Sequence, residues 1–400
     1  MVVKTMKKNI YYIFIIIIFL NMVLSQSCFS SGGEEIINND IILKQFQKLD
    51  LEDLKREVEK INDRAGDYLP ELNIKKILIS LSNHKFNYKW KDLIISFIKY
   101  LGNEVTANFR LMGKIIILAI FTAVLNLFHE SFSNETISNT AKLLIFLLLA
   151  VLLLQSFKLT IDIGIKTIDY MVSFMQALLP VLLSLLVGVG AVSSAAIFHP
   201  FTYIIITILS TLIKNLIFPM IFISAVLNIV NNISNNFNIS SLAKLFKEFS
   251  MGLLTLFLLI FVGGLLLQGG AAALADSLTL RTAKYLTGTF IPVIGGILSD
   301  AVDLIVSCSL IIKNALNIFG VLAILFIIIY PIIKILAIYI VYRFVGAILQ
   351  PVCDEGLINM FEDLANSLLM VFLVVLTVSF MFFIILTIIT GAANLTVMMR

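Results

Sequence analysis

Charged side chains are scarce through most of this sequence, and their scarcity excludes a soluble protein. Only 14% of the 400 residues are charged, 60% are hydrophobic, and the mean hydropathy is +1.02. Soluble domains are about 25% charged and about 45–50% apolar. Residues 28–110 hold 26 charges in 83 positions, but residues 111–400 hold only 25 in 290. One core cannot bury so many apolar side chains, so most face lipid. A soluble enzyme, a nucleic-acid-binding module and a disulfide scaffold are excluded.

Residues and motifs that carry chemistry are also few. The three cysteines form no C-x-x-C pair, the three histidines are widely separated, and neither set indicates a metal site. The motifs G-x-S-x-G, H-E-x-x-H and G-x-x-x-x-G-K-[ST] are absent. We therefore expect no catalytic residues, no cofactor and no metal. An intramembrane enzyme that uses Ser193, Ser194 and His199 is the alternative, and too few of the groups of a triad are present to favour it.

The N-terminus has the pattern of a targeting segment. Lys4, Lys7 and Lys8 precede an apolar run over residues 10–24, and small residues at 25–27 offer a cleavage site. We predict a signal peptide over residues 1–27, with an uncleaved anchor as the alternative. Either one exports the segment that follows, so residues 28–110 are expected outside the cytoplasm.

Residues 28–110 are predicted to form a small helical extracytoplasmic domain. Leu51, Leu54, Val58 and Ile61 recur at spacings of three, four and three, the pattern of an amphipathic helix, and Asp50 is available as its N-cap. The domain is either a solvated cap or a docking surface for another extracytoplasmic protein.

The rest of the chain, residues 111–400, is predicted to be an all-α polytopic membrane domain. Apolar stretches of about 17–25 residues are long enough to cross a bilayer. About seven such spans put the C-terminus in the cytoplasm, with connecting loops around residues 158–166 and 281–284. Residues 290–312 are ambiguous, and residues 201–230 are either one kinked helix or two half-helices. The expected spans are 111–128, 141–157, 171–190, 201–230, 249–268, 318–342 and 367–390.

Two parts of the membrane domain resemble each other, which predicts an internal duplication. Residues 242–257 align with 357–372 at an offset of 115, and Tyr170 aligns with Tyr285 at the same offset. The repeats are expected over residues 167–268 and 282–383. Transport folds are often built from two such halves, with the working site between them. The halves are inverted if each holds an odd number of spans and parallel if each holds an even number.

Polar residues at membrane depth are costly and usually face protein or water, so they are the candidates for function. Two of the lysines fall at equivalent places in the repeat, the aspartates share one helical face, and His199 follows a run of small residues that permits close packing or a break. Glycine-rich stretches lie on either side of Arg281 and Lys284, and a re-entrant segment is one interpretation of this region. The alternative is that these residues have no function beyond structure: the lysines snorkel to the membrane surface, the aspartates form an interfacial acidic pair, and the histidine is structural. The candidate polar-path or subunit-contact residues are Lys214, Lys313, Asp300, Asp303, Arg281, Lys284 and His199.

Three stretches resemble the stage III sporulation protein AE family. They are GAVSSAAIFHP at 190–200, TLRTAKYLTGTFIPV at 279–293 and NLTVMMR at 394–400, and the resemblance runs from about Trp90 to the end. It implies an endospore-forming bacterium and a multi-pass protein of the mother-cell membrane around the forespore. It also implies partners, namely other stage III sporulation membrane proteins and a forespore membrane protein, in a secretion-like channel complex that sustains late forespore gene expression. The family offers no catalytic residues to carry over.

Two functions follow from these observations. The first is a non-enzymatic membrane subunit of that transenvelope channel complex. The second is a stand-alone permease or channel built from the internal repeat.

Overall fold

A computed structural model describes residues 45–47, 49–65, 71–82, 90–107, 113, 116–117, 120–121, 135–233, 239–290, 295–351, 353 and 355–398. Every regular element within these ranges is a helix, which confirms the all-α prediction. The chain divides into two compact units, residues 1–48 and 49–400, and the second holds all the helices described below. The predicted signal peptide, residues 1–27, lies outside the described residues.

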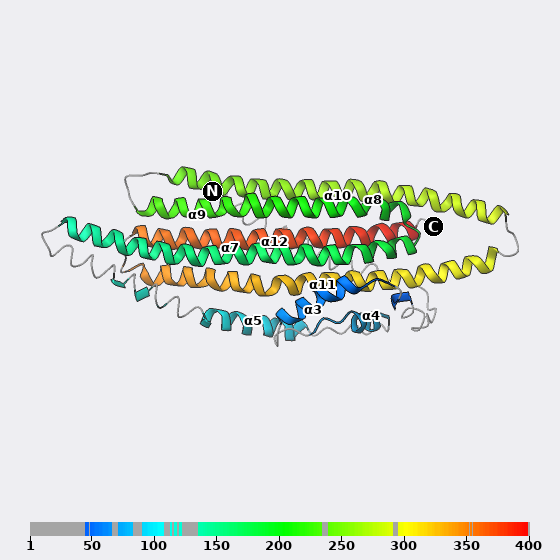
Figure 1. Cartoon of the computed structure of the whole chain (residues 1–400), viewed down its shortest axis with the longest axis horizontal. Coiled ribbons are helices and arrows are strands. Elements are labelled where there is room, and N and C mark those ends of the chain that lie inside the picture. The colour runs from blue at the N-terminus through cyan, green and yellow to red at the C-terminus, as the bar shows by residue number, and fades with distance from the viewer. Residues whose placement is uncertain are drawn as a thin grey trace. The chain divides into compact units, whose positions relative to one another are not determined.

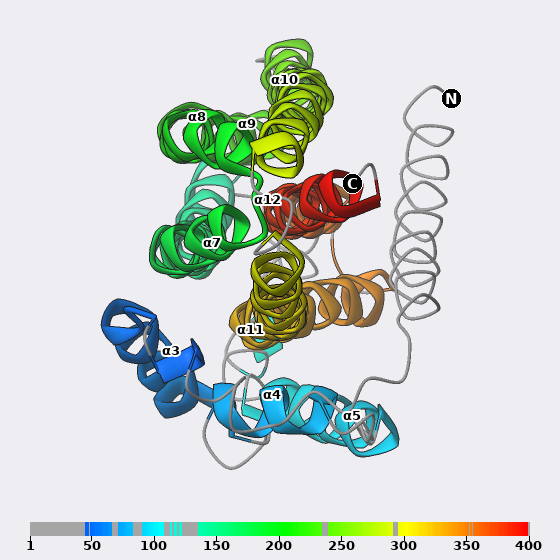
Figure 2. The same cartoon turned by 90° about the vertical axis from the view of Figure 1, so that its right-hand side faces the viewer.

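Long helices make up the membrane part of the chain (Figure 1). The α8 and α9 helices are joined by η2, a short π-helical turn, into one continuous helical segment. The α12 helix packs against all of the others and lies in the middle of them in the end-on view of Figure 2. The bounds are α7 Glu135–Gly188, α8 Val192–Leu212, η2 Ile213–Ile217, α9 Phe218–Ile233, α10 Ser240–Phe290, α11 Gly295–Leu349 and α12 Glu355–Met398.

Five helical segments of the described residues are long and apolar enough to cross a membrane, which agrees with the prediction of a polytopic membrane protein. Together they overlap six of the seven expected stretches, two of which, 141–157 and 171–190, fall in the same segment. The seventh, residues 111–128, lies largely outside the described residues, and the count of seven spans stays a prediction. All five exceed the roughly 20 residues that a bilayer requires, so each helix continues beyond the hydrocarbon layer. The segments are Phe146–Gly188, Val192–Asn232, Ser240–Ala272, Val306–Leu349 and Glu355–Gly391.

The loop expected around residues 158–166 is wrong, because this stretch is helical and joins two expected spans into α7. Lys158, Asp162 and Lys166 all lie on exposed positions of the helix, where their charges meet solvent or headgroups without interrupting it. The hydroxyls of Thr160 and Thr167 face inward and donate to carbonyls one turn earlier in the same helix. The three charged residues therefore lie on one exposed face of a continuous helix and do not mark its end.

The loop and the re-entrant segment expected near residues 269–284 are also wrong, because α10 runs without a break from Ser240 to Phe290. One glycine of this stretch, Gly269, serves helix packing instead. A Cβ on Gly269 would lie 3.2 Å from Ile388 Cγ2 of α12 and 3.6 Å from Phe198 Cζ of α8. Residues 242–249 and 357–364, which begin the two aligned stretches of the predicted repeat, form the first turns of α10 and α12.

Residues 201–230 form one continuous helical segment, which decides between the two interpretations of that stretch. The segment widens at η2, where the amide of Phe218 donates to the Ile213 carbonyl five residues earlier. Pro219 follows immediately and has no amide hydrogen to donate, so the wider turn relieves the clash that proline makes with the preceding turn. Lys214 lies within this turn.

The small-residue run that begins at Gly188 does contain a break in the helix. The α7 helix ends at Gly188, and Gly190 has a φ of 92°, a left-handed conformation that glycine adopts without strain. The Ala191 amide donates to the Leu186 carbonyl at 3.0 Å and closes the helix end. The α8 helix then returns antiparallel along α7.

Three shorter helices precede the membrane part: α3 Glu52–Ala65, α4 Ile74–Ser82 and α5 Trp90–Ala107. The predicted amphipathic face of α3 is confirmed, since Leu54, Val58 and Ile61 are buried and Asp50 accepts a hydrogen bond from the Glu52 amide at 3.3 Å. The α3 helix packs against α7 and α11, and α4 and α5 pack against α11. The boundary of a separate domain at residue 110 stays a prediction.

Candidate functional site

An ion pair between Lys214 and Asp169 links η2 to the middle of α7. The Lys214 side chain is 24% exposed and that of Asp169 is 47% exposed. The π-helical turn presents Lys214 toward α7, where the carboxylate neutralises it. Lys214 is therefore a charge held by a partner at the surface of the helix pair, and the interpretation as a freely snorkelling lysine does not describe it.

Lys313 occupies a different environment in the interior of the bundle. Lys313 is fully buried on α11, and its Nζ donates a hydrogen bond to the Thr390 carbonyl of α12 at 3.0 Å. The side-chain oxygens of Asn314 and Asn317 on the same helix are buried and accept no hydrogen bond from the described residues. These three polar residues lie within one turn of α11, and the hydrogen bond of Lys313 to the Thr390 carbonyl links α11 to α12.

Asp276 of α10 caps the start of α8. It is 1% exposed, and its two carboxylate oxygens accept hydrogen bonds from the amides of Ser193 at 2.7 Å and Ser194 at 3.0 Å. Amides at a helix N-terminus lack partners within the helix and carry partial positive charge, so a carboxylate satisfies both needs. Nearby, Gln268 of the same helix donates to the Ile197 carbonyl at 2.8 Å.

Asp276 is not among the residues predicted from the sequence, although one signal points to it. It is the only acidic residue between Glu248 and Asp300, and it follows a glycine- and alanine-rich stretch. A lone carboxylate at membrane depth needs a partner. The partner is a backbone N-terminus more than 80 residues earlier, which sequence spacing does not reveal.

The predicted site residues whose side chains the structure describes, Lys214, Lys313 and His199, do not converge on one site. Lys214 contacts α7 and Lys313 contacts α12, so the two proposed repeat equivalents have different partners. His199 lies on an exposed position of α8, whereas Ser194 is buried, and the two do not form a nucleophile–base pair. Arg281 and Lys284 lie in α10, and Asp300 and Asp303 in α11; their side chains are outside the described set.

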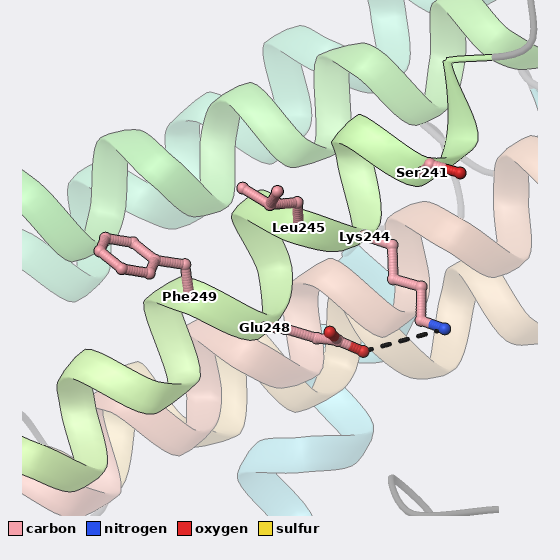
Figure 3. A pocket seen from close by; sticks show the side chains of 5 residues that line it. All are labelled: Ser241, Lys244, Leu245, Glu248 and Phe249. Carbon is pink, nitrogen blue, oxygen red and sulfur yellow. Dashed lines mark ion pairs between the residues drawn. The ribbon is translucent and has the colours of Figure 1, made fainter.

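A hollow on the surface lies along the first turns of α10 (Figure 3). Lys244 and Glu248 form an ion pair across one helical turn at 3.9 Å, while Leu245 and Phe249 are each more than half exposed. All of its lining residues come from this one helix, so the hollow is a groove in a lipid- or headgroup-facing surface rather than an enclosed binding site. Within the described residues, no group of three or more His, Cys, Asp and Glu side chains is placed to hold a metal ion.

Comparison with known proteins identifies the relatives of this chain. The family model described as stage III sporulation protein AE matches residues 72–393. Stage III sporulation protein AE of Bacillus subtilis (strain 168) is 38% identical over 335 residues, which cover 84% of each chain. No solved structure matches the chain. With a match that covers most of the membrane bundle, this chain belongs to the stage III sporulation protein AE family and has a role in sporulation.

Proposed function

We propose that the chain is a non-enzymatic integral subunit of a channel complex that links the mother cell and the forespore. One observation carries the proposal: the polar groups at membrane depth are used to hold helices together. Asp276 ties α10 to α8, Lys313 ties α11 to α12, and Asp169 ties α7 to η2. An enzyme needs such groups to converge on one reacting centre, whereas a structural subunit needs them at its helix contacts.

The family membership supports the setting of this function. The partners would be other stage III sporulation membrane proteins and a protein of the forespore membrane. The chain would lie in the mother-cell membrane around the forespore, with residues 28–110 outside the cytoplasm and the C-terminus in the cytoplasm. In that position it would support endospore development and late forespore gene expression.

A stand-alone permease is the second candidate, and the buried cluster of Lys313, Asn314 and Asn317 favours it. Buried polar groups on one helix can line a path for a polar solute. A permease would move its solute without any partner, which separates the two candidates by experiment.

The test uses the full-length chain in two settings. Affinity-tagged protein from sporulating cells should co-purify with other stage III sporulation proteins, and the same protein alone in liposomes should not release an entrapped mixture of small ions and metabolites. Release without partners, abolished by Lys313→Met, would establish the permease and overturn the subunit. Purification free of any other sporulation protein would also contradict the subunit.

A further inference from the structure

A line of polar side chains runs along the outer surface of the α7–α8 pair. Of this line, the function proposed above uses only the pair of Asp169 and Lys214. On α7 the residues are Asp169, Ser173 and Gln176, at spacings of four and three, which place them on one helical face. On α8 and η2 they are Thr207, Thr211 and Lys214, with the same two spacings. We call these six residues the polar seam.

The two helices are in register along the seam. Asp169 pairs with Lys214, and two turns away Gln176 Nε2 donates to Thr207 Oγ1 at 3.4 Å. The helices run antiparallel, so Ser173 and Thr211 lie at one level between these two contacts. Each level of the seam thus offers one polar side chain from α7 and one from α8.

The seam is exposed, although its neighbourhood is apolar. Ser173, Thr207 and Thr211 are exposed. The α3 helix packs on α7 and α11 and places Arg64 over the ring of Tyr170, next to Asp169, while α4 and α5 pack on α11. The outer face of α10 provides the contrast, because most of its exposed side chains are aliphatic and suited to lipid: Leu256, Leu259, Ile260, Leu266 and Leu267. Figure 2 shows α7 and α8 together on one side of the bundle and α10 at its edge.

The seam lies at membrane depth. Its α7 residues belong to the segment Phe146–Gly188 and its α8 and η2 residues to the segment Val192–Asn232, both of which are long and apolar enough to cross a membrane. The Thr207 hydroxyl donates to the Tyr203 carbonyl at 2.8 Å and accepts from Gln176. The exposed hydroxyls of Ser173 and Thr211 would lack a partner in hydrocarbon, which is unfavourable, so protein is expected to cover them.

We infer that a second copy of this chain covers the seam. Two copies in one membrane have the same orientation, so a two-fold axis that relates them runs along the membrane normal. When this axis runs in front of the seam, α7 of each copy lies opposite α8 of the other. Rotation about the membrane normal leaves the depth of every residue unchanged, so residues at one depth in the first copy meet residues at the same depth in the second. Asp169 of one copy then faces Lys214 of the other, and the two ion pairs merge into one network of four alternating charges.

The uncharged levels of the seam are self-complementary in the same way. Gln176 of one copy faces Thr207 of the other, and Ser173 faces Thr211. Amides and hydroxyls both donate and accept hydrogen bonds, so each meeting can be satisfied. Serine and threonine are also small enough to let membrane helices approach closely. A different partner would need its own matching charges at the right level, whereas a second copy has them by symmetry.

The sharpest test separates the charges between copies. Asp169→Lys gives a copy with two lysines at this level, and Lys214→Asp gives a copy with two aspartates. Each variant alone faces like charges in its own dimer, so self-association of the purified full-length protein should weaken by about tenfold. Together the two variants should form a mixed dimer, because every charge then faces an opposite charge on the other copy. A merely intramolecular ion pair would gain nothing from mixing.

A cross-linking measurement checks the geometry in native membranes. Ser173→Cys and Thr211→Cys are placed on two copies that carry different tags, and oxidation should give a disulfide-linked pair that contains both tags. Leu267→Cys in both copies is the matched control and should give no such pair. Monodisperse elution in detergent verifies that each variant folds. Failure of the mixed dimer to form, or a cross-link from the seam to another protein only, would overturn the inference. It stands or falls independently of the channel complex.

Discussion

The α10 and α12 helices have similar compositions and opposite surroundings. α10 carries no charge between Glu248 and Asp276, and α12 carries none between Asp363 and Arg400. Yet only 28% of the most apolar stretch of α10 is buried, against 61% of that of α12. Apolar composition thus places a helix in the membrane but does not decide whether protein or lipid covers it. The contacts decide, since α12 packs against every other helix of the bundle and α10 lies at its edge.

The interior of the bundle should tolerate added volume least. A Cβ on Gly320 of α11 would lie 2.7 Å from Leu178 Cδ2 and 3.1 Å from Leu386 Cδ1 of α12. Gly320→Leu should therefore destabilise the protein by about 3 kcal/mol or more and lower its yield from membranes. Thermal unfolding in detergent measures the effect.

Gly270→Leu on α10 is the matched control for this change. A Cβ on Gly270 meets nothing within 4 Å, and both glycines lie inside helices, so both variants gain the same helix propensity. The control should be as stable as the parent. Equal losses from the two substitutions would mean that α10 is buried in this chain as deeply as α11.

The cap on α8 should give the next largest effect, because Asp276 is the one buried charge among the described side chains of α10. Asp276→Ala removes the acceptors of two amides and should cost about 2 kcal/mol. Asp276→Asn keeps one acceptor and should lose less. Thermal unfolding compares them with Glu248→Ala on the same helix, whose side chain is 57% exposed. If the Glu248 variant lost as much as Asp276→Ala, the cap would not be the cause.

A single buried hydroxyl should have a smaller effect. Tyr342 of α11 is fully buried and donates to the Leu153 carbonyl of α7 at 3.2 Å. Tyr342→Phe keeps the ring packed against Phe361, with ring centroids 6.3 Å apart, and loses only the hydrogen bond. We expect a loss of about 1 kcal/mol. Tyr339→Phe on the same helix serves as the comparison, and an equal loss there would point to a general effect of removing a hydroxyl.

The structural features that could be predicted from the sequence are those that depend on a few neighbouring residues. The spacing of Leu54, Val58 and Ile61 predicted the buried face of α3, and a break was one of the two interpretations of the small residues from Gly188. Apolar runs also located the membrane helices. Each of these features depends on a few neighbouring residues, so it can be recognised without knowing the packing.

Features that depend on distant partners could not be predicted. A search for apolar stretches as long as one bilayer crossing divided α7 into two predicted spans at its charged residues. Such a stretch does not show that Lys158, Asp162 and Lys166 share one exposed face of a continuous helix. The partner of Lys214 is 45 residues away, and the partners of Asp276 are more than 80 residues away. The seam on α7 and α8 likewise exists only because the two helices pack antiparallel in one register.

The outer face of α10 should show the smallest effect, and it defines the opposite end of the comparison. Leu267 is 80% exposed and touches little protein, so Leu267→Ala removes apolar surface that faces lipid in the folded chain and should change stability by less than about 0.5 kcal/mol. Leu386→Ala on the interior of α12 removes the same atoms from a fully buried site and should cost about 2–5 kcal/mol. Thermal unfolding of the two variants in one detergent compares identical chemistry in the two surroundings. A loss at Leu267 as large as that at Leu386 would mean that protein covers this face of α10, and the bundle would then need a second surface for association besides the polar seam.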